Sequence, residues 1–203
     1  MLFRKQLPLL AAAAMILGLM GASEAASDFM TTGSVTSQPV GHYELCARSP
    51  DECRQVTQRT APVELTRDLW DRIIDINNRV NLTVIPRTDM ELWGVEEFWS
   101  YPDAFGDCED YVLEKRRLLM EAGVPAGNLL ITVVRQPNGD GHAVLTINTS
   151  MGDYVLDNIE PRVLAWSQTQ YEFLKRQSAS NSGKWVSVND GRSVAVGAVS
   201  SNR

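Results

Sequence analysis

The hydrophobic pattern of this chain changes at Pro125, and that change limits the possible folds more than any other feature of the sequence. Before Pro125, residues 66–80 place apolar side chains at three- and four-residue spacing, which predicts an amphipathic helix. Residues 107–123 predict a second helix, with Asp107 as its N-cap and Gly123 just past its end.

After Pro125 the apolar residues form β-branched runs or alternate with polar residues, as is typical of strands. We expect strands over residues 129–135, 142–148, 154–158 and 184–188, whereas residues 171–176 fit either a strand or a short helix. A turn at residues 138–141 joins the first two strands into a hairpin. Helices followed by strands predict an α+β fold, with the helices packed on one side of an antiparallel sheet.

The N-terminus has the three parts of a cleavable signal peptide. Arg4 and Lys5 precede an apolar run over residues 7–20, and small residues follow around Ala25. An uncleaved membrane anchor is the alternative, but this run of about 14 residues is shorter than the roughly 20 that cross a bilayer. We therefore expect residues 1–26 to be a signal peptide, and the mature protein to be periplasmic or secreted without stable membrane insertion.

One domain accounts for the rest of the chain. Residues 27–41 are small and polar without an apolar period, which predicts a flexible lead-in; residues 42–190 form the domain, and residues 191–203 are expected to be a frayed tail. The 19 basic and 25 acidic residues give the whole chain a net charge of -6. Because clusters of Lys and Arg bind phosphate backbones, this balance argues against nucleic acid as a partner.

Three cysteines in an exported chain leave one thiol without a partner. Cys46 and Cys53 stand seven residues apart around a Pro-Asp turn, and a local disulfide is the simplest interpretation in an oxidising compartment. A redox or metal-binding pair is the weaker alternative, since the spacing is not Cys-x-x-Cys and no second ligand pair exists in the sequence. Cys108 is then the unpaired thiol.

Cys108 lies in the first turn of the second predicted helix. A free cysteine is commonly a small buried hydrophobe, and position alone favours that interpretation. However, the unsatisfied N–H groups and the dipole at a helix N-terminus favour a thiolate, and the same groups can stabilise the oxyanion that acyl transfer creates. Cys108 is therefore the candidate nucleophile.

A thiolate nucleophile needs a base, and the chain has two histidines. His42 lies at the end of the lead-in beside the cysteine pair, where a solvent-exposed or locally bonded ring is expected. His142 opens a strand after a glycine-containing turn that leaves its ring accessible. His142 is therefore the candidate base.

Asp157, on the following strand, is the candidate for orienting the imidazole. A connecting turn with an even number of residues puts His142 and Asp157 on the same face of the sheet. Direct opposition requires a turn centred on residues 149–150, whereas Gly152 favours a turn centred on residues 151–152, which would shift the pair by four residues along the strands. A bulge or an adjusted turn must then close the gap. The alternative role for Asp157 is a strand-end cap.

Taken together, these motifs resemble the bacterial transglutaminase-like cysteine proteinases. The similarity rests on Gly-Asp-Cys-Glu-Asp-Tyr at 106–111, Lys115, His-Ala-Val-Leu at 142–145, Leu-Asp-Asn at 156–158, the paired cysteines, Trp93 and Trp99, and it extends from about Leu45 to Arg176. The resemblance implies a papain-like, transglutaminase-type fold, with Cys108 as nucleophile, His142 as base and Asp157 as the orienting residue.

Some members of that family are periplasmic, calcium-dependent proteases that cleave large surface adhesins, and acidic residues flanking their nucleophile hold calcium. By motif these residues correspond to Asp107, Glu109 and Asp110, and no organic cofactor is expected. Three carboxylates beside a thiol should raise its pKa unless a cation neutralises them, and Ca²⁺ prefers such oxygen ligands. The alternative is plain helix capping, and backbone carbonyls and water would have to complete the 6–8 oxygens of a calcium site.

The stretch before the nucleophile departs from the papain pattern, which places a Gln oxyanion donor there. Residues 99–105 contain no Gln or Asn, so the Cys108 N–H is the expected donor and the second donor is unidentified. The sequence predicts an exported cysteine peptidase that cleaves a surface or periplasmic protein through a thioacyl intermediate. A transglutaminase or protein-glutamine deamidase with the same triad, or an inert calcium- or adhesin-binding module, are the alternatives.

Overall fold

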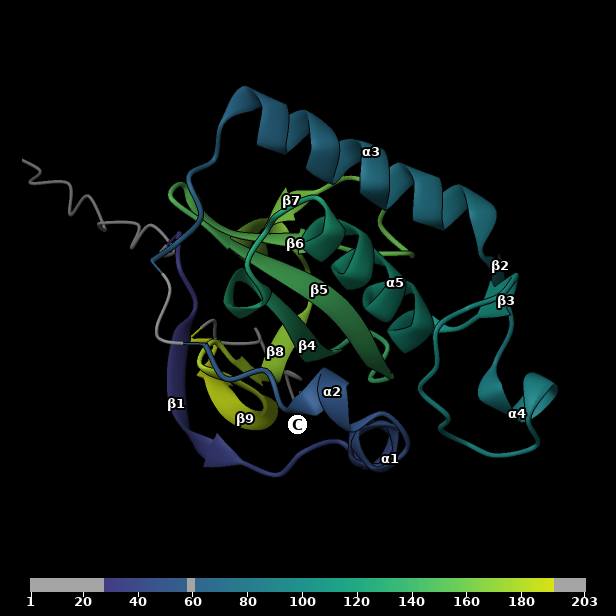
Figure 1. Cartoon of the computed structure of the whole chain (residues 1–203). Helices are drawn as coiled ribbons and strands as arrows, with labels where there is room; N and C mark the ends of the chain where they lie inside the picture. The colour runs from purple at the N-terminus through teal and green to yellow at the C-terminus, as the bar shows by residue number, and fades with distance from the viewer. Residues whose placement is uncertain (1–27, 58–60, 192–203) are drawn as a thin grey trace, which may run out of the picture.

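Helices dominate the first part of the chain and strands the second (Figure 1). The computed structural model describes residues 28–57 and 61–191. The helices are α1 Val40–Arg48, α2 Pro50–Cys53, α3 Arg67–Thr83, α4 Asp89–Leu92 and α5 Cys108–Glu121, with 3-10 turns η1 Ala126–Asn128 and η2 Trp166–Gln168. The strands are β1 Thr31–Thr36, β2 Ile85–Pro86, β3 Phe105–Gly106, β4 Leu129–Arg135, β5 Gly141–Thr149, β6 Gly152–Leu156, β7 Leu164–Ala165, β8 Glu172–Ser178 and β9 Asn181–Asn189. The predicted signal peptide and residues 192–203 of the predicted tail lie outside the described residues.

The large sheet has the strand order β1-β9-β8-β4-β5-β6-β7, and every pair in it is antiparallel. Short turns join β4 to β5 and β5 to β6, so these strands are neighbours in both sequence and space. The segment that fitted either a strand or a helix is strand β8. The predicted antiparallel meander is confirmed.

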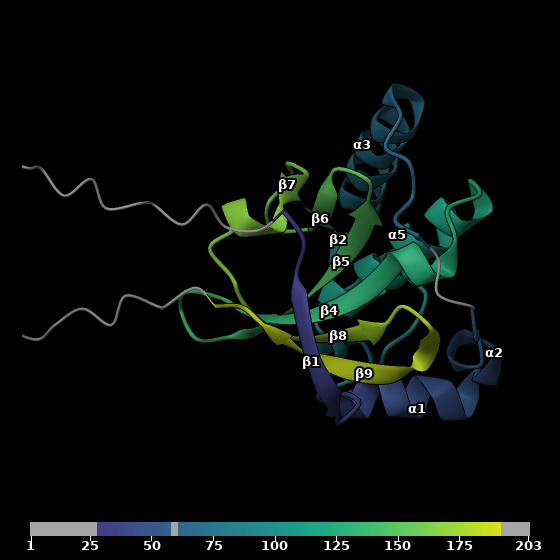
Figure 2. The same ribbon diagram turned by 90° about the vertical axis from the view of Figure 1, so that its left-hand side faces the viewer.

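Helices α3 and α5 lie on the same side of this sheet (Figures 1 and 2). The core between them and the sheet contains Ile73, Ile76 and Val80 of α3, Val112 and Leu119 of α5, and Leu145, Ile147 and Leu156 of β5 and β6. Thr66 caps α3 by accepting a hydrogen bond from the Leu69 backbone N–H at 3.2 Å. The predicted α+β arrangement of helices on an antiparallel sheet is confirmed, and α5 is held along β5.

The opposite face of the sheet buries a smaller apolar cluster. Val144 of β5 and Val155 of β6 belong to it, together with Phe173 of β8. Trp166 of η2 packs edge-on against Phe173, with ring centroids 5.6 Å apart. This contact fixes the segment after β7 against the sheet.

The flexible lead-in predicted for residues 27–41 is wrong for residues 28–41, the part that the structure describes, because this part contains a strand and the start of a helix. Strand β1 pairs with β9, for example Thr31 with Asn189, and α1 begins at Val40. Almost all β1 side chains are exposed, so backbone hydrogen bonds hold it at the edge of the sheet. A strand of this kind has no apolar alternation that a sequence pattern could detect.

The predicted disulfide joins Cys46 and Cys53, whose Cα atoms are 5.5 Å apart. A solvent-exposed ring was one of the two expectations for His42, and it is wrong. His42 lies on α1 and is only 1% exposed. Trp185 Nε1 donates to His42 Nδ1 at 3.2 Å, and burial lowers the pKa of His42 to about 4. His42 is therefore a neutral core residue beside the disulfide.

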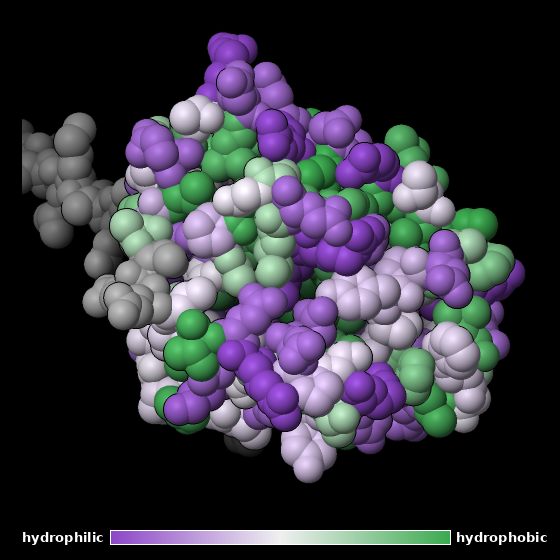
Figure 3. Space-filling model, in the orientation of Figure 1, coloured by the Kyte–Doolittle hydropathy of each residue, from purple (hydrophilic) through white to green (hydrophobic). Residues whose placement is uncertain are grey.

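Apolar side chains gather along the right-hand edge of Figure 3, where Figure 1 places α4, β2 and β3. The exposed apolar residues of this part of the chain include Ile85, Met90, Trp93, Val95 and Phe105. None of the helices in the described ranges combines the length and apolar character that crossing a bilayer requires.

Candidate active site

The thiol of Cys108 lies where a strand turns directly into a helix. Strand β3 ends at Gly106, Asp107 is the N-cap, and Cys108 is the first residue of α5. A Cβ on Gly106 would lie 2.7 Å from both Cβ and Oδ2 of Asp110, so glycine is required for this close turn. The first backbone N–H groups of a helix have no partner within the helix, and here they can face a developing oxyanion.

Polar groups from two elements surround this thiol. Cys108 Sγ donates a hydrogen bond to Glu109 Oε2 at 3.1 Å. Burial raises the pKa of the Cys108 thiol well above its usual value and the Glu109 carboxylate raises it further, whereas the Ala143 backbone N–H beside the sulfur lowers it. Ala143 directly follows His142 on β5. The Cys108 thiol therefore lies beside the residue next to the predicted base. The described residues include no hydrogen bond between Cys108 and His142.

His142 and Asp157 are joined directly. Thr149 pairs with Gly152, so the turn between β5 and β6 is centred on residues 150–151, midway between the two alternatives that the sequence offered. This register places Asp157 two positions from direct opposition to His142 and on the same face, a diagonal spacing that side chains can bridge. His142 Nε2 lies 2.8 Å from Asp157 Oδ1, with both side chains buried.

Three residues that the sequence did not single out hold Asp157 in place. Tyr171, just before β8, donates its hydroxyl to Asp157 Oδ2, and the Ile159 backbone N–H donates to Oδ1 at 3.0 Å. Asn81 of α3 donates to the Asp157 backbone carbonyl at 2.8 Å. Burial acts to raise the pKa of Asp157, but the hydrogen bonds from His142 and Tyr171 outweigh it and the pKa is lowered. Asp157 is thus an ionised, fully hydrogen-bonded partner for the imidazole.

A carboxylate cluster lies on the other side of the thiol. Strands β2 and β3 pair in parallel, so Asp89, which follows β2, and Asp107, which follows β3, come to the same edge. Oxygens of Asp89, Asp107 and Glu109 lie within 4.8 Å of one another. The Asp89 backbone N–H donates to Asp107 Oδ2 at 3.1 Å, and Asp89 Oδ2 accepts from the Phe98 backbone N–H. The sequence did not single out Asp89, although Thr88 and Glu91 form the capping box that starts α4 beside it.

The chemistry of this cluster fits a hard cation. One oxygen each of Asp89, Asp107 and Glu109 is buried without a hydrogen-bond partner. Burial raises the pKa of Asp107 and, together with the Asp107 charge, raises the pKa of Glu109 to about 9. Buried carboxylate oxygens that face one another without donors are the ligands that Ca²⁺ takes.

Asp110, the third predicted ligand, lies beside this cluster but is not one of its three members. Its Oδ1 accepts from the Ser100 backbone N–H at 2.8 Å, while its Oδ2 is buried against Gly106 without a hydrogen-bond partner. Burial raises the pKa of Asp110 to about 7. Asp110 therefore ties the segment before β3 to α5 and leaves one oxygen unused.

Residues 32–193 match the family described as bacterial transglutaminase-like cysteine proteinase BTLCP. The chain belongs to this family. It is accordingly a cysteine peptidase, as the sequence motifs predicted. No curated protein gives a significant match to the sequence.

The fold of this cysteine proteinase is similar to that of solved structures of Legionella pneumophila LapG. The calcium-bound form has a TM-score of 0.51 and 24% identity, over 58% of this chain and 68% of that chain. A second structure has a TM-score of 0.49 and 26% identity over 58% and 68% of the two chains, and the EGTA-treated form has 0.49 and 26% over 58% and 67%. The predicted transglutaminase-type fold is confirmed.

Proposed function

We propose that this cysteine proteinase cleaves peptide bonds with Cys108 as nucleophile, His142 as base and Asp157 as the residue that orients His142. One observation carries the proposal: His142 of β5 is hydrogen-bonded to Asp157 at 2.8 Å, and the backbone N–H of the next residue, Ala143, lies beside the Cys108 sulfur. Because Nε2 of His142 is committed to Asp157, Nδ1 is the nitrogen available to the thiol.

The proposed reaction has two halves. Cys108 Sγ attacks the carbonyl carbon of the scissile bond while its proton passes to His142 Nδ1, and backbone N–H groups at the start of α5 stabilise the oxyanion. The C–N bond then breaks, the leaving amine takes the proton from His142, and a thioester remains on Cys108. Water, deprotonated by His142, hydrolyses this thioester and restores the thiol. The first step requires the thiol to turn from Glu109 towards the imidazole.

We also propose that Asp89, Asp107 and Glu109 hold Ca²⁺, with backbone carbonyls and water as further ligands. The support is the set of buried carboxylate oxygens without donors, together with the calcium-bound structure of the similar LapG. A cation there would neutralise the charges that raise the pKa of Cys108. The groups that would react remain those of the chain itself, namely the Cys108 thiol, the His142 imidazole and the backbone N–H groups at the start of α5.

The substrate that we propose is a surface adhesin, and the location is the periplasm. Both follow from the family resemblance and from the predicted signal peptide at residues 1–26. An exported protease and a surface adhesin are both present outside the cytoplasm, where cleavage can occur.

The test compares surface proteins of the source bacterium, incubated with the purified secreted chain and CaCl₂, by mass spectrometry of new N-termini. We expect new termini with the wild type and with Asp75→Asn, a control at an exposed residue of α3, and none with Cys108→Ala or His142→Ala. Cleavage that persists in both site variants would contradict the proposed peptidase chemistry. Incorporation of an added primary amine would instead indicate transamidation, and a mass increase of glutamine residues without cleavage would indicate deamidation.

A further inference from the structure

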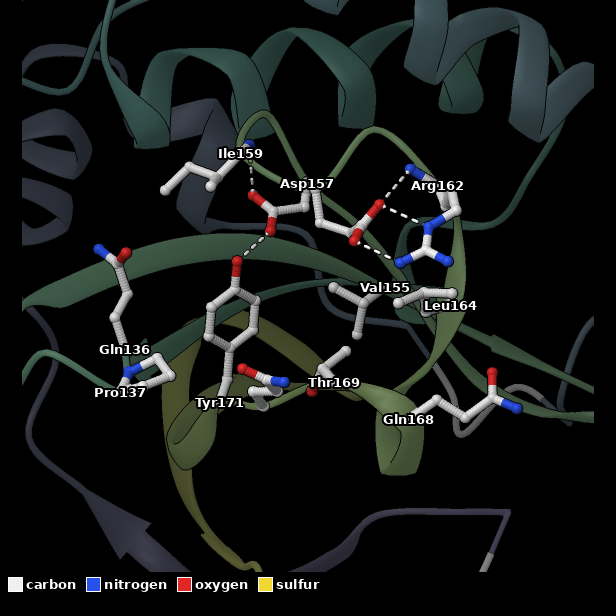
Figure 4. Close-up of a pocket in the computed structure, with 12 residues that line it drawn as sticks. Gln136, Pro137, Val155, Asp157, Ile159, Arg162, Leu164, Gln168, Thr169 and Tyr171 are labelled. Atoms are coloured by element: carbon white, nitrogen blue, oxygen red, sulfur yellow. Dashed lines mark hydrogen bonds and ion pairs between the residues drawn. The ribbon is translucent and has the colours of Figure 1, made fainter.

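Donors from elsewhere in the chain fix carboxylates of both proposed sites, the triad and the calcium site. At Asp157, Figure 4 shows the Tyr171 hydroxyl and the Ile159 N–H directed at the two carboxylate oxygens. Beside the carboxylate cluster the donors are backbone N–H groups of residues 98–100, which belong to no helix or strand. A segment of this kind needs support from other elements if it is to hold carboxylates in one orientation.

The N–H groups of Phe98 and Ser100 each bind one oxygen of a carboxylate. Phe98 N–H donates to Asp89 Oδ2, and Ser100 N–H donates to Asp110 Oδ1 at 2.8 Å. The second oxygens, Asp89 Oδ1 and Asp110 Oδ2, are buried without a hydrogen-bond partner among the described residues. The segment therefore sets which oxygen of each carboxylate stays open, and Asp89 is one of the three proposed calcium ligands.

The carbonyl between these two N–H groups is bound by α1 instead. Arg48, in the last turn of α1, donates from Nη2 to the Trp99 carbonyl oxygen at 2.8 Å. Its guanidinium carbon also lies 4.0 Å from the centroid of the Phe98 ring, where a cation–π attraction adds to the hydrogen bond. Arg48 thus contacts the two consecutive residues directly before Ser100.

Other contacts hold the same segment against α1 and α2. The Trp99 side chain is 3% exposed, and a Cβ on Gly41 of α1 would lie 2.3 Å from the indole, so this helix and the indole are in close contact. Tyr101 donates its hydroxyl to Glu52 of α2 at 2.8 Å. Because the disulfide joins α1 to α2, the two helices form one support for the segment.

We propose that Arg48 is a positioning residue of the calcium site: it fixes residues 98–99, and the N–H groups of this segment orient Asp89 and Asp110. The proposal rests on the proposed function, because it takes the calcium site from there. Arg48 is not a ligand, since its guanidinium is a cation that is bound to a carbonyl oxygen and an aromatic ring. It acts through the backbone of the segment that it holds.

The test measures the Ca²⁺ dissociation constant of the full secreted chain by isothermal titration calorimetry. Arg48→Met removes the charge and the hydrogen bond, and we expect the dissociation constant to rise about tenfold, because loss of supporting contacts around metal ligands typically costs that much. Arg48→Lys keeps a cation over the ring and a donor for the carbonyl, so its constant should lie within about threefold of the wild type.

Glu44→Gln is the matched control. Glu44 forms a half-exposed ion pair with Arg48 at 4.0 Å, and pairs of this kind contribute little, so its removal should leave the dissociation constant unchanged. Amide hydrogen exchange in EGTA gives a second readout. In Arg48→Met the Phe98 and Ser100 amides should exchange roughly tenfold faster, and the amides of β5 should change much less, because the loosening is local.

Equal dissociation constants for wild type and Arg48→Met would overturn the positioning role while leaving the calcium site intact. A weaker affinity of Arg48→Met with equal acceleration of the segment and the β5 amides would also overturn it, since that result reflects a general loss of stability. A wild-type chain that binds no Ca²⁺ would remove the proposed calcium site and this proposal with it. The failure of the positioning role and the failure of the calcium site are therefore distinguishable.

Discussion

Asp157 is a buried carboxylate whose two oxygens are both in use. His142 Nε2 and the Ile159 N–H share Oδ1, and the Tyr171 hydroxyl binds Oδ2. The lowered pKa keeps this group ionised, so it can hold the Nε2–H tautomer of His142 and leave Nδ1 as a base. Its role in the proposed mechanism is therefore orientation and not proton transfer.

Asp157→Asn tests this role at constant side-chain size. The amide lacks the charge and turns one acceptor into a donor, which favours the wrong imidazole tautomer, so we expect kcat to fall by about 10³-fold with KM little changed. Single-turnover acylation by p-nitrophenyl acetate measures the effect, with Asp75→Asn as the matched surface control. If the Asp157→Asn variant retains a tenth of the wild-type rate, Asp157 is only a strand-end cap.

The raised pKa values of the acidic residues predict how calcium binding depends on pH. The pKa of Glu109 is about 9 and that of Asp110 about 7 in the metal-free chain, so Glu109 carries a proton at neutral pH that a cation must displace. Because binding releases this proton, affinity for Ca²⁺ should rise from pH 6 to pH 8, by up to about tenfold per pH unit for each proton released. Isothermal titration calorimetry in buffers of different ionisation enthalpy measures the release. An affinity independent of pH would contradict these protonation states.

At the scale of elements, a short parallel pair of strands builds the carboxylate cluster. Asp89 begins α4 just after β2, and Asp107 caps α5 just after β3, so the pairing of β2 with β3 fixes the distance between them. Gly106 allows Asp110 to pack against β3. The start of α5, which carries the proposed nucleophile, and the proposed calcium site are therefore one structural unit.

Gly106→Ala should disturb that unit without removing a ligand. Its Cβ would meet Asp110 at 2.7 Å, so β3 or the first turn of α5 must shift, and we expect Ca²⁺ affinity to fall about tenfold or more, since loss of supporting contacts around a metal site typically costs that much. Gly141→Ala is the control, because a Cβ at Gly141 meets nothing within 4 Å. Equal affinities of the two variants for Ca²⁺ would show that the β3–α5 turn does not position the ligands.

Elements with a strong hydrophobic period were predictable from the sequence. Elements held mainly by backbone hydrogen bonds to a distant strand were not. The apolar spacing of α3 and the β-branched residues of β4 gave their approximate bounds. Strand β1 and the two-residue strands β2 and β3 depend on pairing with distant segments, which leaves no local pattern. Cys108, His142 and Asp157 could be singled out by residue type and by position in their elements. Asp89 and Tyr171 could not, because only the fold brings Asp89 close to Asp107 and Tyr171 close to Asp157.

Across the whole molecule, the core between helices and sheet contains one lysine that the proposed mechanism does not use. Lys115 of α5 is 0% exposed, and its Nζ has no hydrogen-bond partner in the described part of the chain. Burial lowers the pKa of Lys115 to about 7, and the charge of Asp157 acts against this shift. A proton that the unfolded chain binds readily is thus bound weakly in the folded chain.

This difference makes the stability of the fold depend on pH. Between pH 7 and the ordinary lysine pKa near 10.5 the unfolded state binds more protons, so the free energy of unfolding should rise with pH over this window, and the cost of the buried charge is complete below it. Lys115→Met removes that cost, so it should stabilise the protein by on the order of 2 kcal/mol at pH 6 and progressively less towards pH 10. Urea unfolding of wild type, Lys115→Met and the exposed control Lys184→Met at both pH values measures this. A stabilisation by Lys115→Met that is the same at both values would mean that Lys115 keeps its ordinary pKa through a partner such as Asp157, and that the core holds an ion pair.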